Sequence, residues 1–480
     1  MPFLGLSMPH RPSTAHADLG PDFFDEVAAA SFPQAILRHR DQRWAELVGL
    51  DGLSDEAWVA HFGRFEPLPG SLAKPLALRY HGHQFRSYNP DLGDGRGFLF
   101  AQLHDLRDGR LLDLATKGSG TTPWSRGADG RLTLKGGVRE VLATAMLEAQ
   151  GVNTSKSFSL IETGEELQRH DEPSPTRAAV LVRLSHSHIR IGTFQRLAYH
   201  KDAEGLQRLV DHSIRHYMPG LWQEDAAART GAFYAEVAAG VARMGAQWMA
   251  AGFVHGVLNT DNINITGESF DYGPWRWLPT LQPGFTAAYF DHSGLYAYGR
   301  QPETLLWSLA QLGSCLLALI EKEPLLAVLD GYEAQFHAAY AAAVLRRLGL
   351  ASRGAETDGR LARAFATFLE ASQVPFEQGF FDWHGGLASE ARASRSPAAA
   401  HYAQAAFVPV REALAGYEPA AEAKPDHRYF NRPIPCTMLI DEVEAIWAPI
   451  AEADDWSRLH AKLAEIGDMA EAYGNAPGVP

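Results

Sequence analysis

The sequence predicts an α+β protein with two lobes, a small antiparallel sheet lobe and a larger helical lobe, together with an extension at each end. Three observations favour this class. Short apolar runs and glycine-rich turns fill residues 76–190, apolar residues at helical spacing dominate residues 205–345, and a loop dense in Asp, Asn, Gly and Pro separates two helices at residues 255–298. This order is typical of a sheet that carries a single helix and is joined to a helical region.

The composition is that of an ordinary globular protein. Of the 480 residues, 46% are apolar and 21% are charged, which excludes wholesale disorder, collagen and coiled coils. The net charge of −14 argues against general nucleic-acid binding, because phosphate contacts need a surplus of Lys and Arg. We therefore expect no nucleic-acid partner.

Cysteine usage and hydropathy predict a cytoplasmic protein. Cys315 and Cys436 are far apart and form no C-x-x-C pair, which excludes a disulfide framework and a thiolate zinc site. The first 20 residues contain no apolar run of signal-peptide length. The longest apolar stretch, residues 305–320, is interrupted by polar residues and is too short to span a bilayer. We expect no membrane association.

The extension at the N-terminus is irregular and rich in Pro, His and aromatic residues. It is predicted to lie over the core, with short helices at residues 23–30 and 55–62. The Ala-rich C-terminal extension is predicted to pack against the helical lobe. The four segments are residues 1–70, the sheet lobe 71–195, the helical lobe 196–350 and the C-terminal extension 351–480.

The sheet lobe begins with a predicted hairpin. Two apolar runs, 97–103 and 110–116, flank Asp108-Gly109, and this dipeptide favours the positive φ angles of a tight turn. A helix over 137–150 follows, because Val138, Val141, Leu142 and Ala145 recur at helical spacing before Gly151. Two further strands are predicted at 157–162 and 178–184.

The helical lobe contains a long helix over residues 226–251. Its apolar stripe is formed by Phe233, Val237, Val241, Met244 and Trp248, and Gly252 ends it. A second helix is predicted over 302–319. The polar loop between these helices is where chemistry is expected.

Two glycine-rich turns lie at the edges of the sheet lobe. The first is Gly93-Asp94-Gly95-Arg96-Gly97, whose glycines would let backbone amides approach phosphate, with Arg96 adding positive charge. The second is Gly127-Ala128-Asp129-Gly130-Arg131. Taken alone, the first is equally well interpreted as an ordinary hairpin turn, and for the second an ordinary loop is the favoured interpretation.

Basic side chains are placed to bind a polyphosphate. Lys117 ends a predicted strand, and Glu140 follows on the next helix; a strand lysine held by a helix glutamate binds phosphate oxygens in kinase-like sheets, although such a lysine can also face solvent. Arg183 and Arg190 flank one strand end and could clamp phosphate oxygens. His186 and His188 lie between them without a third ligand spaced for a metal, so we interpret them as surface histidines.

The loop that starts at His255 contains Asp261, Asn262 and, nine residues after Asn262, Asp271-Tyr272-Gly273. An Asn and an Asp supply oxygen ligands that suit Mg²⁺, while a second Asp can accept a hydroxyl proton. The alternative is a run of Asx turns. The order of glycine loop, strand Lys, helix Glu, Asp/Asn loop and Asp-Tyr-Gly indicates a two-lobed, protein-kinase-like fold. Unlike in protein kinases, Asp261 and Asn262 are adjacent.

With these motifs the sequence resembles the selenoprotein O (SelO) family of kinase-like protein adenylyltransferases over about residues 75–310. The matching segments are 80–85 (YHGHQF), 92–97 (LGDGRG), 117–120 (KGSG), 255–262 (HGVLNTDN), 271–274 (DYGP), 291–294 (DHSG) and 301–303 (QPE). Many members carry a Cys or selenocysteine pair near the C-terminus. Residues 473–480 contain none, so redox control through that end is not supported.

The resemblance implies transfer of AMP from ATP to Ser, Thr or Tyr hydroxyls of proteins, with ATP bound in reverse relative to kinases. It implies nucleotide contacts in the sheet lobe and the catalytic and metal loops in the helical lobe of a monomer. Asp261 would accept the proton, assisted by Lys117 and Glu140, and Asn262 and Asp271 would hold Mg²⁺ or Mn²⁺. Without the resemblance, a kinase-type phosphotransferase and a non-catalytic ATP-binding module remain alternatives. The implied nucleotide contacts are Gly93, Gly95, Arg96, Lys117, Asp129, Gly130, Arg183, Arg190 and Asp271.

Overall fold

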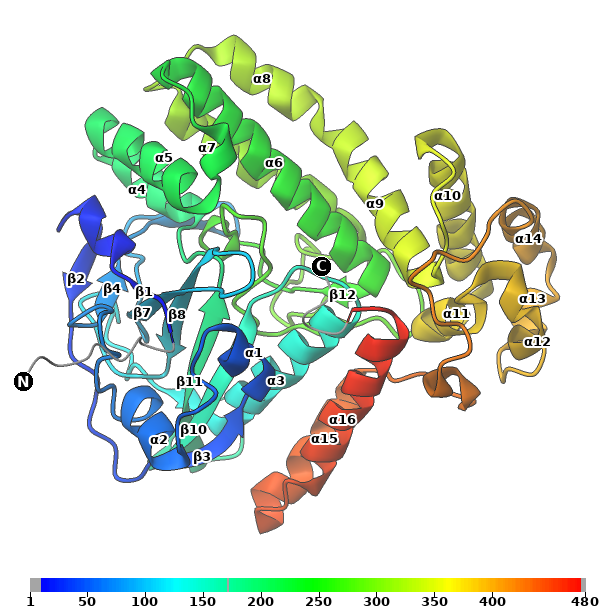
Figure 1. The fold of residues 1–480 in the computed structure, drawn as a ribbon, viewed down its shortest axis with the longest axis horizontal. Helices are drawn as coiled ribbons and strands as arrows, with labels where there is room; N and C mark the ends of the chain where they lie inside the picture. The colour runs from blue at the N-terminus through cyan, green and yellow to red at the C-terminus, as the bar shows by residue number, and fades with distance from the viewer. Residues whose placement is uncertain (1–9, 171, 476–480) are drawn as a thin grey trace, which may run out of the picture.

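The computed structural model describes residues 10–170 and 172–475 and places an antiparallel sheet beside a layer of long helices (Figure 1). The described residues do not include 1–9, where no signal peptide is expected, or 476–480, which belong to the tail without cysteine. Within the described residues, nine strands form the main sheet, with the order β2-β4-β7-β8-β11-β10-β3, β1 on β7 and β9 on β11. The strands are β1 (Pro12–Ser13), β2 (Phe24–Glu26), β3 (Ile36–Arg40), β4 (Leu76–Leu78), β7 (Leu99–His104), β8 (Leu111–Lys117), β9 (Leu132–Thr133), β10 (Lys156–Leu167) and β11 (Thr176–Ser185).

The predicted hairpin and the two further predicted strands are confirmed. β7 and β8 pair antiparallel around Asp108-Gly109, where Gly109 has φ +77° and Arg110 N donates to Asp108 Oδ1 at 2.9 Å. β10 and β11 also pair antiparallel, and β11 pairs with β8 so that Lys117 lies opposite Leu181. This register places the end of β8 in the middle of the sheet.

Helices cover both faces of the sheet. Side chains alternate along a strand, so Leu160 and Leu181 pack with α3 (Leu134–Ala149), whereas Ile161 and Val182 pack with α2 (Asp55–Phe62). α3 begins at the N-cap Thr133, whose side chain accepts from Gly136 N, and Gly137 allows close contact with Leu160. The predicted helices over 55–62 and 137–150 are therefore confirmed. α1 (Gln42–Leu47) lies beside α2 in the sequence.

The predicted helix over residues 23–30 is wrong. Phe24–Glu26 forms strand β2, which pairs with β4, and Ile36–Arg40 forms β3, which pairs with β10 at the far edge of the sheet. Helix propensity is a weak local preference, and unpaired edges of a sheet offer backbone hydrogen bonds that override it. Segment 1–70 thus contributes strands to the main sheet.

The long helix predicted over 226–251 is confirmed as α6 (Ala226–Ala251). It is capped by Asp225 and ended by Gly252 at φ +67°. Its neighbours are α4 (Ile191–Tyr199), α5 (Ala203–Tyr217), α7 (Gln301–Leu316), α8 (Lys322–Asp330) and α9 (Tyr332–Leu348). Two small antiparallel strand pairs lie outside the main sheet. The pair of β12 (Phe253–Val254) and β13 (Arg276–Trp277) encloses part of the polar loop, and β5 (Gly82–Gln84) and β6 (Ser87–Asn89) form a projecting hairpin. Short 3₁₀ helices occur at Ala15–Leu19, Pro219–Leu221, Thr260–Asn262, Tyr298–Arg300, Gly386–Ser389, Ala405–Phe407 and Arg428–Asn431.

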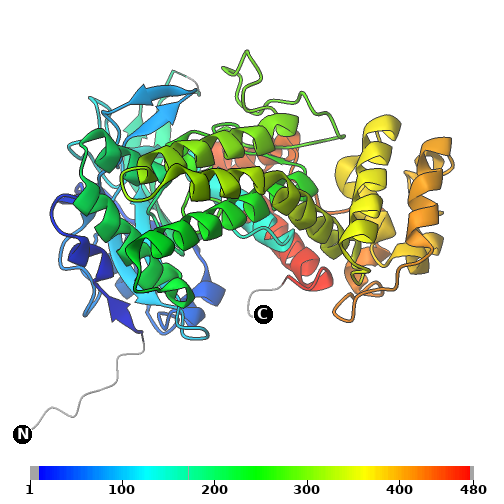
Figure 2. The ribbon, with the colours of Figure 1, turned by 90° about the horizontal axis from the view of Figure 1, so that it is seen from above.

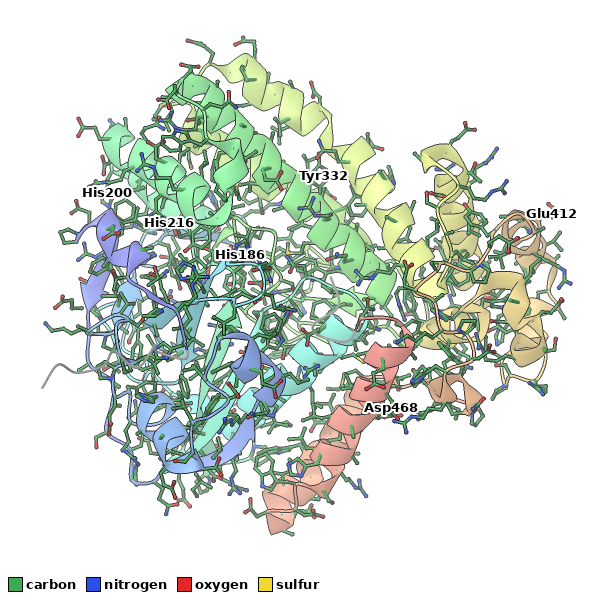
Figure 3. The ribbon with its side chains drawn as sticks, viewed as in Figure 1. His186, His200, His216, Tyr332, Glu412 and Asp468 are labelled. Atoms are coloured by element: carbon green, nitrogen blue, oxygen red, sulfur yellow. The ribbon has the colours of Figure 1, made fainter. Side chains whose placement is uncertain are left out.

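The C-terminal segment packs in two places, on the helical region as predicted and also on the helix of the sheet region. α10 (Ala355–Ser372) packs on α9, whereas α16 (Ser457–Ala472) packs on α3, beside α15 (Ile440–Ala453) (Figure 1). Lys135 of α3 pairs with Glu444 of α15 at 2.7 Å, and Asp468 of α16, labelled in Figure 3, pairs with Arg428. The remaining helices are α11 (Phe376–Trp383), α12 (Glu390–Ala393), α13 (Ala399–Tyr402) and α14 (Val408–Leu414).

No helix within residues 10–170 and 172–475 combines the length and the apolar character that crossing a bilayer requires.

Candidate active site

Lys117 and Glu140 meet inside the sheet region. Lys117 is the last residue of β8, and its Nζ contacts Glu140 Oε1, which projects from α3. Lys117 is only 4% exposed, so the alternative in which it faces solvent is wrong. A buried ammonium needs a charged partner, and Glu140 provides one.

Asp271 connects this pair to Arg183. Its Oδ1 lies 3.1 Å from Lys117 Nζ and 3.1 Å from Arg183 Nη1, so two cations from two strands converge on one oxygen. Burial alone would raise the pKa of Asp271, but Lys117, Arg183 and Arg190 outweigh it and hold this pKa well below its usual range. Asp271 adopts φ +63°, a strained left-handed conformation typical of functional sites.

Arg190 reaches the same region from the start of α4. Its guanidinium donates to the backbone oxygen of Asp261 at 3.1 Å and lies 3.5 Å from Asp94 Oδ1. The guanidinium also stacks over Tyr80 at 4.1 Å and over Phe270 at 5.1 Å. Because Phe270 also lies 5.9 Å from Arg183, the two arginines flank the residue that precedes Asp271.

The first glycine turn packs tightly against the segment after β8. A Cβ at Gly93 or Gly95 would collide with Trp124, and one at Gly97 would collide with the backbone of Thr116. Gly118 N donates to Arg96 O at 2.6 Å. Within the described chain, the amides of Gly95 and Arg96 donate to no protein acceptor, and the Arg96 side chain is exposed. These glycines therefore have a packing role, and two amides in the turn have no acceptor among the described residues.

The second glycine turn separates into two parts. Gly130 lies against Gly120, where a Cβ would collide with the backbone, and Gly120 N donates to Gly130 O at 3.2 Å. Asp129 is exposed, and its carboxylate pairs with Arg169 at 2.8 Å. The structure therefore places Gly130 against Gly120, three residues after Lys117, but it does not bring the Asp129 carboxylate into contact with Lys117.

The polar loop begins at His255, which is buried. A short 3₁₀ helix, Thr260–Asn262, follows it. His255 Nε2 lies 3.0 Å from Phe270 O, which joins the two ends of the loop. Asp261 is 8% exposed, and burial raises its pKa to about 6 even though Arg190 opposes the shift. Its Oδ1 has no hydrogen-bond partner in the described structure.

A network that the sequence did not reveal holds Asp261 in place. Thr260 Oγ1 donates to Gln195 Oε1 at 2.6 Å and accepts from His83 N at 2.7 Å. A Cβ on Gly82 would lie 2.7 Å from Asp261 Oδ1, so the β5–β6 hairpin covers this carboxylate. Asp94, which contacts Arg190, was also missed as a site residue, although it lies within the first glycine turn. These contacts join segments 65 residues or more apart, for which a single sequence gives no signal.

The free oxygens of the loop fit a hard divalent cation. Asn262 Nδ2 donates to Val257 O at 3.0 Å, which leaves Asn262 Oδ1 available, and Asp271 Oδ2 is engaged by no ion pair in the described part of the chain. Carboxylate and amide oxygens are ligands that Mg²⁺ and Mn²⁺ accept. Among the described residues no group of three or more His, Cys, Asp or Glu could hold a metal by itself, so phosphate oxygens and water would complete the coordination.

The prediction that His186 and His188 are surface residues is wrong, because His188 is buried and His186 is half-buried. His188 is buried, its backbone N donates to Asp113 Oδ2 at 2.9 Å, and its ring packs edge-on against Phe270. His186, labelled in Figure 3, follows β11 and packs edge-on against Tyr217 at 5.5 Å. The apolar β11 strand leads them inward, and burial lowers the pKa of both.

Comparison with known proteins identifies relatives over almost the whole chain. The model of the family described as protein adenylyltransferase SelO matches residues 6–467. Three similar proteins carry the name protein nucleotidyltransferase YdiU. That of Gloeobacter violaceus is 47% identical over 474 residues (96% of this chain, 95% of the relative), that of Trichodesmium erythraeum 42% over 477 residues (96% and 99%), and that of a Synechocystis species 50% over 357 residues (73% and 72%).

Proposed function

The chain belongs to the SelO family of protein adenylyltransferases and is a nucleotidyltransferase, and on that premise we propose how its residues transfer AMP from ATP to protein hydroxyls. ATP is the substrate. The observation that carries the proposal is the convergence of Lys117 and Arg183 on Asp271 Oδ1, each at 3.1 Å, with Arg190 across Phe270. Three buried cations around one carboxylate form a site for phosphate oxygens.

The two regions would act as lobes of a kinase-like fold with ATP between them. The sheet, including the strands contributed by residues 1–70, would supply Lys117, the glycine turns and Arg183, while the helical region would supply the polar loop. The unpaired amides of Gly95 and Arg96 in the described turn and the backbone around Gly130 would contact the nucleotide. In this proposal Asp129 lines the pocket through its backbone position, because its carboxylate pairs with Arg169.

The position of the buried positive charge supports the reversed orientation of ATP. Arg183 and Arg190 stack against Phe270 and Tyr80 instead of facing solvent. Burying guanidinium groups is costly unless anions pair with them. Asp271 pairs with Arg183 and Asp94 lies near Arg190, and the γ-phosphate would add negative charge there, which adenine would not. The arginines would therefore hold the triphosphate end, and the α-phosphate would lie toward Asp261.

In the transfer step, the acceptor hydroxyl oxygen attacks the α-phosphorus and the bond to the bridging oxygen breaks, releasing diphosphate. Asp261 takes the hydroxyl proton; with a pKa of about 6 it is ionised at neutral pH yet more basic than an ordinary aspartate. Lys117, oriented by Glu140, binds phosphate oxygens. Asn262 and Asp271 would hold Mg²⁺ or Mn²⁺, which supplies charge neutralisation on the phosphates.

The position of the transferred label tests this function. With dephosphorylated casein as acceptor and Mg²⁺ or Mn²⁺ present, label from α-³²P-ATP should enter casein and the enzyme itself, and label from γ-³²P-ATP should not. Snake-venom phosphodiesterase should release the label as AMP, and EDTA should prevent its incorporation. Label from the γ position alone would identify a kinase-type phosphotransferase, and binding without any label would identify a non-catalytic ATP-binding module.

Arg183→Ala should weaken the affinity for an ATP analogue much more than the affinity for AMP. If Arg183 holds the γ-phosphate, affinity for α,β-methylene-ATP falls about 10- to 100-fold, the range expected for losing one or two charge-assisted hydrogen bonds. Affinity for AMP should change by less than about threefold. Isothermal titration calorimetry measures both.

Arg229→Ala is the matched control, because Arg229 is a comparably buried arginine that pairs with Asp211 at 2.8 Å on α5, away from the polar loop. It should leave both affinities unchanged. Equal losses for the ATP analogue and AMP in Arg183→Ala would contradict the reversed orientation.

A further inference from the structure

Three aromatic side chains from two distant parts of the chain form an exposed patch beside the polar loop. Phe85 is 36% exposed, Tyr289 80% and Phe290 42%. The Phe85 and Phe290 rings lie 5.8 Å apart and those of Tyr289 and Phe290 lie 5.2 Å apart. We call Phe85, Tyr289 and Phe290 the aromatic platform. Contiguous exposed apolar side chains mark interaction sites more often than scattered ones do.

The platform is hydrogen-bonded to the segment that carries Asp261. Phe85 N donates to Asn259 Oδ1 and lies 3.1 Å from Tyr296 Oη, and Tyr296 Oη donates to the same Asn259 oxygen at 2.8 Å. On the same hairpin, Gly82 lies against Asp261 itself. The aromatic platform is therefore fixed to a residue only two positions before the proposed proton acceptor.

The turn that carries Phe85 has a specific backbone conformation. Phe85 and Arg86 form the turn between β5 and β6 with φ +49° and +63°, although neither is glycine. Strain of this kind persists where the surroundings impose it and is concentrated at functional sites. In Figure 2 the light-blue hairpin and the green loop that carries Tyr289 and Phe290 project on the same side of the molecule.

Buried Asp291 orders the loop that carries Tyr289 and Phe290. Its Oδ1 accepts from Leu295 N at 2.9 Å and from Ser293 Oγ at 3.2 Å, and its Oδ2 accepts from Tyr296 N at 2.7 Å. These bonds form an ordered turn directly after Phe290, and the rings of Tyr289 and Phe290 are exposed next to it. The two rings are therefore attached to an ordered turn.

We propose that the aromatic platform binds the acceptor protein, as an extended segment with an apolar side chain within a few residues of the hydroxyl that receives AMP. This inference rests on the proposed function and specifies the substrate of the same site. A protein hydroxyl that reaches Asp261 must bring its neighbouring residues over the surface around Asn259, and that surface is the platform. Its charged neighbour Arg86 is already paired with Glu303 at 3.2 Å, so selection is for apolar contact.

The test uses the double variant Tyr289→Ser/Phe290→Ser with denatured, dephosphorylated casein as acceptor. For the wild-type protein, mapping of AMP-modified sites by mass spectrometry should show apolar residues enriched at a fixed offset from the modified hydroxyl. In the variant this enrichment should disappear and kcat/KM for casein should fall about tenfold, the size expected for losing contact with one apolar side chain. The KM for ATP should not change.

Leu317→Ser and Ile434→Ser are matched controls, because both side chains are exposed and apolar but lie outside the aromatic platform. Neither substitution should change kcat/KM for casein. Wild-type labelling without an apolar preference, or a preference that survives in the double variant, would overturn the inference. A wild-type dimer that the double substitution converts to a monomer in light scattering would assign the platform to self-association instead. Absence of α-label on casein with the wild-type protein would count against the proposed function, not against the platform alone.

Discussion

Asp271→Asn should reduce adenylyl transfer by about 10³-fold or more, the range seen when a preorganised charge or metal ligand is removed from a phosphoryl-transfer site. Asn keeps the shape of the side chain but removes the negative charge on which Lys117 and Arg183 converge at 3.1 Å. The metal would lose its carboxylate ligand, and two buried cations would lose their shared partner. We expect Mg²⁺-dependent ATP binding to weaken at the same time.

The measurement is incorporation of α-³²P label into casein, together with thermal unfolding to show that the variant is folded. A loss of stability is expected, because removing one partner of a buried ion pair leaves the others uncompensated. Asp211→Asn is the matched control, since Asp211 also pairs with a buried arginine, Arg229, at 2.8 Å. It should lose stability but keep transfer. Near wild-type transfer by folded Asp271→Asn would remove Asp271 from the site.

Elements specified by local sequence were predictable, and elements that depend on a distant partner were not. The residues 226–251 carry a long apolar stripe between a good N-cap, Asp225, and Gly252, so the sequence alone defines α6. By contrast, β2 is three residues long and exists because β4 is available to pair with it. Its sequence, Phe-Asp-Glu, contains no strand pattern that could have been recognised.

The same distinction holds for the site. Lys117 and Glu140 are 23 residues apart, on a strand and the helix that follows, so their spacing indicated the contact that the structure shows. The hydrogen bond of Arg190 to Asp261 O and the contact of Gly82 with Asp261 join segments 71 and 179 residues apart. Such contacts depend on how the sheet and helices pack. Asp129 illustrates the limit of motifs, because Arg169, which no motif includes, occupies its carboxylate.

Asp261→Asn should inactivate the protein and stabilise it at neutral pH. Removing the proton acceptor should lower kcat by about 10²- to 10⁴-fold. Wild-type activity should fall about tenfold per pH unit below pH 6, where Asp261 becomes protonated, and level off above it, whereas the residual activity of the variant should lack this dependence. Buffered assays between pH 5 and pH 8 measure both profiles.

The stability effect has the opposite sign from that of Asp271→Asn. Burial raises the pKa of Asp261 from 3.8 to about 6, so the folded state binds the proton more tightly than the unfolded state does. The wild-type protein therefore loses stability as pH rises from about 4 to about 6, by up to ~3 kcal/mol at ~1.4 kcal/mol per pKa unit. Asn carries no charge and avoids this loss.

Urea unfolding should thus show Asp261→Asn to be more stable than wild type at pH 8, with the difference vanishing near pH 4. This pH dependence is the internal control, because a packing effect of the substitution would be the same at both pH values. A variant that is equally destabilised at pH 4 and pH 8 would show that the charge of Asp261 is not destabilised by burial. Opposite stability changes at Asp261 and Asp271, with activity lost in both, would distinguish the proton acceptor from the charge that organises the phosphate site.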